Sequence, residues 1–217
     1  MTFASADPLL IAAAGALGAF LAILAELMIA RALPRLGGVP ATWIRITTAA
    51  VTGALGVLLA LRFGAAWELP AYLALAVLAV QLSRIDISHH LLPNPLVLIL
   101  LAAGLVLLLT AAVLTSSWED LLRATLAAAI LSVVYLILAI ISPGGIGMGD
   151  VKLAAPIGLY LGYLGWTQVF YGGALGFVVG GMASYLLLRL KRAERSSEVA
   201  YGPSMLAAAL GVILIMS

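Results

Sequence analysis

Two aspartates, Asp86 and Asp150, are the residues of this chain best suited to do chemistry together. Asp86 precedes the dipeptide Pro93-Asn94, Asp150 follows Gly147-Met148-Gly149, and each aspartate adjoins a long apolar run. A carboxylate is costly beside lipid, so it tends to face the protein interior or a wet cavity and to mark a functional site. Two carboxylates that share a proton can hydrolyse a peptide bond, because the ionised group takes a proton from water while the protonated group polarises the carbonyl.

The residues around Asp150 suit a supporting role. Gly147 and Gly149 permit backbone angles or a close approach of neighbouring groups that other residues would forbid. An apolar helix that opens at Asp150 also favours a negative group, because helix N-termini carry partial positive charge. Lys152 has two open interpretations: a positively charged anchor at the membrane surface, or a group that orients a substrate acid or tunes the dyad.

Each acid also has a structural interpretation. A single aspartate at a helix end is often an interfacial cap. Asp86 and Asp150 favour catalysis because they lie at matching membrane depth and no other pair of acids competes with them. Glu26 lies inside the first apolar run, where it either snorkels or forms a hydrogen bond near the inner face, or supports substrate binding.

The composition predicts an all-α polytopic membrane protein. Of the 217 residues, 65% are hydrophobic and only 9% are charged, and the mean hydropathy is +1.21. A membrane-crossing helix needs about 20 apolar residues, and the apolar runs here are continuous rather than alternating as in barrel strands. We expect about eight transmembrane helices, over Pro8–Ala30, Thr42–Leu61, Pro70–Ser83, Pro95–Thr115, Leu121–Ile141, Val151–Leu164, Thr167–Leu188 and Pro203–Met216.

The distribution of Lys and Arg predicts the orientation of the chain. With the N-terminus outside, only Arg62 and Arg123 lie in outer loops, and the remaining nine basic residues lie in inner loops. Cytoplasmic loops of membrane proteins carry such an excess of Lys and Arg. Asp86 and Asp150 are therefore expected on the cytoplasmic side. The nine inner residues are Arg31, Arg35, Arg45, Arg84, Lys152, Arg189, Lys191, Arg192 and Arg195.

The same composition weighs against several classes of function. The chain has no cysteine, which excludes disulfides, thiol catalysis and a cysteine zinc cluster. His89 and His90 are adjacent and would not converge on one ion, so we expect no metal. A net charge of +2, with the basic residues at helix ends, does not indicate a nucleic-acid partner. No polar stretch is long enough for a soluble domain, so we expect residues 1–217 to form one membrane-embedded domain.

Taken together, these motifs resemble the type IV prepilin peptidases, membrane aspartic proteases of the Gly-x-Gly-Asp type. The first motif of that family places an aspartate several residues before a Pro-Asn turn, as Asp86 precedes Pro93-Asn94. The second motif is similar to Gly147–Leu153, and the segment Ala200–Leu206 resembles the one that opens the family's last helix. The stretch Arg31-Ala-Leu-Pro34 is similar to the one that follows the family's first helix.

The resemblance implies an aspartic endopeptidase with Asp86 and Asp150 as its catalytic residues. Such enzymes remove the short basic leader from prepilins or pseudopilins at the cytoplasmic face of the bacterial inner membrane, after a glycine and before a hydrophobic helix. The implied partners are a prepilin substrate and the lipid bilayer, and the peptidase reaction needs no cofactor. The implied biological setting is type IV pilus assembly or protein secretion.

Many members of the family also methylate the new N-terminus with S-adenosylmethionine. Long members carry a cytoplasmic domain with paired cysteine motifs between the first and second helices, whereas here the corresponding loop is only about Arg31–Arg45 and has no cysteine. Ala25-Glu26 also replaces a more polar pattern that is common in the first helix of the family. These departures weigh against methyltransferase activity, but proteolysis needs only the aspartates and a groove.

Two other readings of the motifs remain open. A presenilin-like intramembrane protease shares Gly-x-Gly-Asp, but that family pairs it with Tyr-Asp and Pro-Ala-Leu motifs, whereas Ile85 precedes Asp86 and no Pro-Ala-Leu occurs in this chain. The second alternative is a small proton-coupled membrane transporter in which Asp86 and Asp150 relay protons. A transporter usually places its acids near the midplane of the membrane, while these are expected at its cytoplasmic edge.

Overall fold

A computed structural model describes residues 7–36, 38–141, 147–189 and 201–216, and these residues form eight α-helices and one short 3-10 helix. The chain is therefore all-α, as its composition predicts. The helices are α1 (Pro8–Ala32), α2 (Thr42–Phe63), α3 (Leu69–His89), α4 (Asn94–Thr115), α5 (Trp118–Ile141), α6 (Met148–Leu164), α7 (Trp166–Arg189) and α8 (Gly202–Ile215), and the 3-10 helix η1 is Pro34–Leu36.

Each of the eight predicted spans corresponds to an observed helix, but some of them, including the third and the sixth, were predicted too short. The third span was expected to end at Ser83, whereas α3 continues to His89 and ends where His90 takes a left-handed conformation with φ of 48°. The helix continues because Ile85 and Asp86 remain buried, so the packed face extends past the last strongly apolar residues. The sixth span was expected to begin at Val151, whereas α6 begins at Met148. Both motif aspartates therefore lie inside helices.

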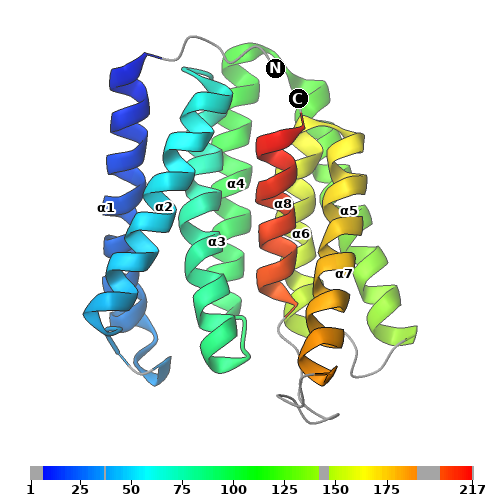
Figure 1. Ribbon diagram of the computed structural model, residues 1–217. Coiled ribbons are helices and arrows are strands. Elements are labelled where there is room, and N and C mark those ends of the chain that lie inside the picture. The colour runs from blue at the N-terminus through cyan, green and yellow to red at the C-terminus, as the bar shows by residue number, and fades with distance from the viewer. Residues whose placement is uncertain (1–6, 37, 142–146, 190–200, 217) are drawn as a thin grey trace.

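The helices run up and down through the bundle in chain order. In Figure 1 the odd-numbered helices descend and the even-numbered helices return, so both ends of the described chain lie at the top. The end of α3 and the starts of α4, α6 and α8 consequently meet at the lower end of the molecule. This alternation brings the two motif aspartates to the same end of the bundle.

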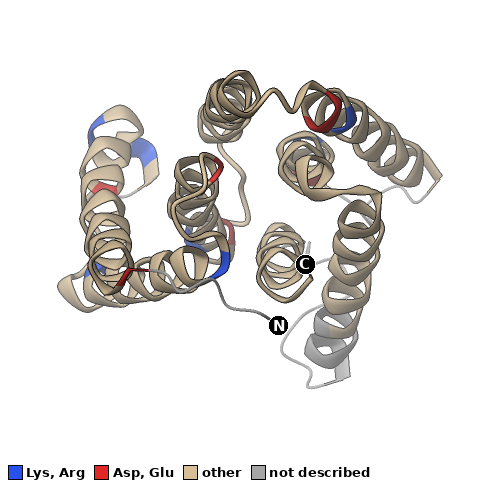
Figure 2. Cartoon of the chain, turned by 90° about the horizontal axis from the view of Figure 1, so that it is seen from above, with Lys and Arg blue, Asp and Glu red and all other residues tan. Residues whose placement is uncertain are grey.

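Helices α5 and α6 run antiparallel and pack closely against each other along their lengths. Helix α8, beside the C label in Figure 2, packs against α3, α6 and α7 on part of its circumference. A Cβ atom built on Gly158 would lie 2.6 Å from the backbone oxygen of Ala127, so only glycine allows α6 to approach α5 this closely. Charged residues occupy only short stretches of the helices (Figure 2).

Two tyrosines connect the helices that carry the aspartates. Tyr72 in α3 is fully buried and donates a hydrogen bond from its hydroxyl to the backbone oxygen of Tyr160 in α6, at 3.1 Å. The ring of Tyr160 lies against Gly104 of α4, where a Cβ atom would come within 2.8 Å of the ring. Buried aromatic hydroxyls usually find such a partner, and the bond fixes α3 relative to α6.

The buried side chain of Glu26 is paired with two residues of α2, Thr48 and Arg45. It is 1% exposed and accepts a hydrogen bond of 2.5 Å from Thr48 Oγ1, while Arg45 Nε lies 3.6 Å from its Oε2 atom. This buried contact joins α1 to α2, and it agrees with the hydrogen-bonded reading of Glu26. A buried carboxylate needs such pairing to offset its loss of hydration.

Five helices of the described chain, α1 to α5, are long and apolar enough to cross a membrane, and α8 is a shorter apolar helix of 14 residues. The length and apolar composition of these helices thus support the expected multi-pass membrane protein. The two predicted outer arginines lie at the upper end, where Arg62 donates to the Met216 backbone oxygen and Arg123 to that of Gly162. Three of the predicted inner basic residues, Lys191, Arg192 and Arg195, lie outside the described residues.

We predict that the lower end of the bundle faces the cytoplasm, because of the excess of basic residues expected there. The chain lacks cysteine, so a single introduced thiol reports its own side. In intact cells, a membrane-impermeant maleimide should label Glu119→Cys, at the upper end, and should label His89→Cys only after the inner face is opened. Both positions are exposed. The reverse labelling pattern would contradict the predicted orientation.

Candidate active site

Asp86 lies in the last turn of α3, directly against the start of α8. Its side chain is buried, with 5% of the residue exposed. A Cβ atom built on Gly202 would lie only 2.7 Å from Asp86 Oδ2. Within the described residues, Oδ2 is buried and forms no hydrogen bond of good geometry, although the backbone N–H of Gly202 interacts with the Asp86 carboxylate. A buried oxygen in that state is costly unless it meets a proton, a water or a ligand, and such atoms mark candidate sites.

Asp150 occupies the first turn of α6 and is 6% exposed. Its Oδ2 atom accepts a hydrogen bond of 3.3 Å from the backbone N–H of Gly147, the residue that caps the helix. The acidic side chain therefore lies where the helix dipole and unpaired N–H groups favour negative charge. Gly147 is thus a direct contact of Asp150.

Leu92, in the turn between α3 and α4, connects the surroundings of the two aspartates. A Cβ atom built on Gly149 would lie 3.1 Å from Leu92 Cβ, and one built on Gly202 would lie 3.2 Å from Leu92 Cδ1. Leu92 thus packs against the backbone beside Asp150 and also against the backbone beside Asp86. The two buried carboxylates belong to one cluster formed by the end of α3 and the starts of α6 and α8.

The structure distinguishes between the two explanations offered for Gly149. Gly149 lies inside α6, and the positive-φ glycines of the described residues are Gly38, Gly64 and Gly165. Unusual backbone angles are therefore not its role. The structure instead favours close approach, because a Cβ atom there would lie 3.1 Å from Leu92 Cβ, tighter than an ordinary contact.

Lys152 lies close to the other motif rather than inside the buried cluster. The residue is exposed, and its Nζ atom donates a hydrogen bond of 3.0 Å to Asn94 Oδ1. Asn94 is the first residue of α4 and belongs to the Pro-Asn dipeptide that follows Asp86. The bond joins the segment after one aspartate to the segment after the other.

The described residues hold no group of three or more His, Cys, Asp or Glu side chains that could bind a metal ion. His89 and His90 are both exposed at the end of α3.

Sequence reasoning did not single out Leu92 or Gly202 as parts of the site. Gly202 lies in the segment Ala200–Leu206 that resembles a family motif, so its position carried a signal, although Ala200 itself lies outside the described residues. Leu92 carried none, because a leucine in an apolar chain has no distinguishing chemistry. Only the folded arrangement reveals that it touches both glycines.

These features define a helical, membrane-type bundle with a buried acidic site at one end. Residues 73–185 match the type IV leader peptidase family, and the chain belongs to this family. The matched range contains both aspartates and all of α3 to α6 except the first residues of α3.

Curated relatives agree with this assignment. A prepilin leader peptidase/N-methyltransferase from Stutzerimonas stutzeri is 34% identical over 153 residues, which is 70% of this chain and 51% of the relative. A protein of the same name from Pseudomonas aeruginosa is 32% identical over 162 residues, covering 74% of this chain and 53% of the relative. The chain thus spans about half the length of the curated relatives it matches. No solved structure gives a significant match.

The contact between Gly202 and Asp86 generates a stability prediction. Gly202→Ala should lower the free energy of unfolding by about 1–3 kcal/mol, because the added methyl group overlaps Asp86 Oδ2. In the Asp86→Ala background most of that loss should disappear, giving a coupling energy of about 1 kcal/mol or more in thermal unfolding in detergent.

Gly211→Ala is the matched control on α8, because a Cβ atom there meets nothing within 4 Å. This variant should not lose stability, since alanine favours helix more than glycine does. An equal loss for Gly202→Ala with and without Asp86 would contradict the described contact.

Proposed function

We propose that this protein is a membrane aspartic endopeptidase that removes the leader of type IV prepilin-like or pseudopilin proteins, with Asp86 and Asp150 as its dyad. The observation that carries the proposal is the burial of both carboxylates in one cluster around Leu92, at one end of the bundle. Membership of the leader peptidase family and the names of the curated relatives support the choice of substrate.

In the proposed reaction the two aspartates share one proton. The ionised carboxylate takes a proton from a water molecule, whose oxygen attacks the carbonyl carbon of the scissile peptide bond. The protonated carboxyl group donates a hydrogen bond to the carbonyl oxygen as negative charge develops there. Collapse of the tetrahedral intermediate breaks the C–N bond, and the departing amine takes a proton from the dyad. The pH dependence of the reaction then reports the ionisation of the pair as a whole, and not that of either aspartate alone.

Neighbouring groups would hold this pair in position. The N–H of Gly147 fixes the orientation of the Asp150 carboxylate. Gly149 and Gly202 let Leu92 approach, and both carboxylates are buried beside it. The bond from Lys152 to Asn94 keeps the start of α6 beside the start of α4. Fixed dipoles and exclusion of water strengthen the electrostatic interactions on which such catalysis depends.

The proposed location is the bacterial inner membrane, with the dyad at the cytoplasmic face and residues 1–217 acting as one membrane-embedded domain. The apolar helices and the bacterial source of the relatives support this placement. The aspartates lie at the end of the bundle rather than halfway along it, which favours a peptidase over a proton-coupled transporter.

Methylation of the product is not part of this proposal. The relatives carry N-methyltransferase in their names, and that activity requires a site for S-adenosylmethionine. The connection between α1 and α2 is short here, and none of its described residues is buried. These residues do not fit an enclosed site for that cofactor, so no step is derived through it.

The dyad generates the first activity prediction. Purified protein in detergent, incubated with a prepilin that carries a Gly-Phe junction, should release a product whose N-terminal residue is phenylalanine. Asp86→Asn and Asp150→Asn should each lower the rate at least a thousandfold, because a shared-proton pair fails when either member loses its charge. Glu119→Gln, an exposed acid at the opposite end, is the control and should cleave normally. Near wild-type turnover by either aspartate variant would reject the dyad.

Gly149 generates the second activity prediction. Gly149→Val should lower single-turnover cleavage at least a hundredfold, because the branched side chain would displace Leu92 and shift Asp150. The control is Gly181→Val on α7, where a Cβ atom meets nothing within 4 Å. Thermal melting in detergent separates lost chemistry from lost folding. Normal cleavage by Gly149→Val would mean that Leu92 does not hold the site together.

A further inference from the structure

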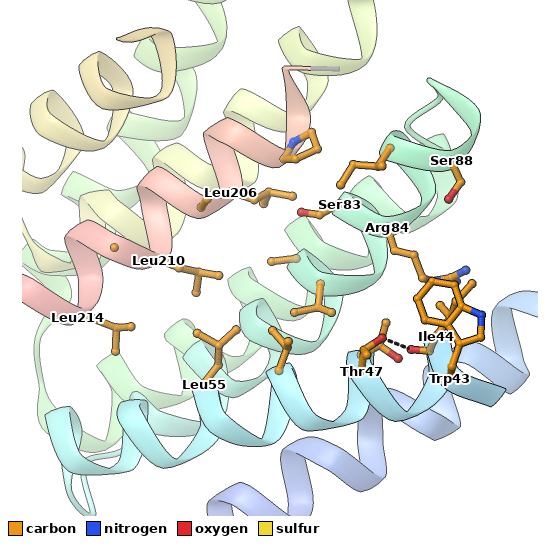
Figure 3. A pocket seen from close by; sticks show the side chains of 18 residues that line it. Trp43, Ile44, Thr47, Leu55, Ser83, Arg84, Ser88, Leu206, Leu210 and Leu214 are labelled. Carbon is orange, nitrogen blue, oxygen red and sulfur yellow. Dashed lines mark hydrogen bonds between the residues drawn. The ribbon is translucent and has the colours of Figure 1, made fainter. Parts of the chain in front are cut away.

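A groove with a volume of about 660 Å³ runs between α2, α3 and α8 (Figure 3). Each of the three helices contributes one face to it, with lining residues spaced three or four apart. That spacing is the one by which a helix presents a continuous face to a neighbouring helix. The α8 face consists of Pro203, Leu206, Ala207, Leu210, Gly211 and Leu214.

Gly211 indicates that this face lacks a neighbour. A Cβ atom built on Gly211 would meet no atom within 4 Å, whereas one built on Gly158, a glycine at a packed contact, would meet the α5 backbone at 2.6 Å. Small residues in membrane helices are typical of faces that another helix approaches closely. Within the described residues, the space over Gly211 is open to such an approach.

The two ends of the groove differ in polarity. Arg84 and Ser88 lie at one end and Leu214 at the other (Figure 3). Arg84 is partly buried and donates from Nε and Nη2 to the neutral Oε1 atom of Gln81, at 3.3 and 3.2 Å. The ion pairs of the described residues do not include it. The Glu26 carboxylate acts on Arg84 electrostatically without forming a direct ion pair with it. The groove therefore offers an apolar length that ends in a cation whose donors are directly bonded only to a neutral amide among the described residues.

The polar end of the groove adjoins Asp86. Ser83 and Ile87, which flank Asp86 along α3, both line the groove. On the opposite wall Pro203 lines it directly after Gly202, the residue whose backbone lies against the Asp86 carboxylate. Asp86 itself does not line the groove, but its neighbours do, so a chain that enters from this end comes close to the segment that carries Asp86.

We propose that the α2–α3–α8 groove binds the hydrophobic helix that follows the scissile bond of the substrate. The helix starts at the Asp86 end and runs toward Leu214, and Arg84 pairs with an acidic side chain or carbonyl oxygen near its start. This inference rests on the proposed leader-peptidase function, which it deepens by assigning the substrate site.

The dimensions of the groove favour a helix. From Pro203 to Leu214 the α8 wall extends over twelve residues. The eleven steps between them, at about 1.5 Å each, give about 16 Å, or three turns. Apolar helices bind such grooves through side chains at positions i, i+3, i+4 and i+7. A phospholipid chain could also fill an apolar groove, but it would not present a peptide bond beside Asp86.

Crosslinking tests the location directly, because the chain contains no cysteine. The probe is a prepilin with a basic leader, a Gly-Phe junction and an apolar helix of about 20 residues, carrying one cysteine at successive helix positions. Ala207→Cys, exposed on the groove wall, should form disulfides with probe positions three or four apart. The matched control Ala174→Cys, exposed on α7, should form at least tenfold less. Absent or equal crosslinking at the two sites would overturn the proposal.

Kinetics provide the second readout. Gly211→Leu should fill the groove, raising KM for the same prepilin at least tenfold with kcat within threefold and lowering the Ala207→Cys crosslink in parallel. Gly181→Leu, at the open glycine of α7, should match the wild type. Unchanged KM in a Gly211→Leu protein that melts like the wild type would overturn the proposal. A lipid site would also overturn the proposal. In that case native mass spectrometry would show a phospholipid bound to the wild type and lost in Gly211→Leu, and the wild type would not crosslink to the prepilin.

The two proposals fail in distinguishable ways. Periodic crosslinking to Ala207→Cys without cleavage of the prepilin would reject the peptidase function and retain the groove as a helix-binding site. Cleavage without crosslinking would retain the peptidase and reject the groove.

Discussion

The packing of one leucine against two glycines is the contact on which the proposed site depends. Leu92 fills the space beside Gly149 and Gly202, so the turn after α3 can lie against the first turns of α6 and α8. Because glycine leaves room for this side chain, three helix ends that are far apart in sequence meet at one place. Asp86 and Asp150 are buried there without sharing a helix.

This junction and the neighbouring groove explain how one end of a membrane bundle could select a peptide bond. The groove runs along α2, α3 and α8, and its polar end lies beside Asp86. A hydrophobic helix held along its length would deliver the bond at its start to the carboxylates, so binding energy far from the reaction would be used for positioning. Helix α2, which the bond between Glu26 and Thr48 joins to α1, supplies one wall of that groove.

Sequence patterns predicted much of the fold and part of the site. Continuous apolar runs predicted all eight helices, and the local bond from Gly147 to Asp150 follows from a helix start. The extension of α3 past Ser83 was missed because polar residues there lie on buried and groove-lining faces that only neighbouring helices define. Leu92 was missed for a related reason: its importance arises from contacts across long sequence separations, which periodicity does not encode.

The central claim is that Asp86 and Asp150 act as a single catalytic unit. Its most direct test compares single-turnover cleavage rates of Asp86→Asn, Asp150→Asn and the double variant. Residues that act as a unit have strongly non-additive effects, because the first substitution already removes the shared function. The account predicts that the double variant is no slower than the slower single variant. Losses that multiply, with measurable residual activity in each single variant, would show two independent contributions and contradict it.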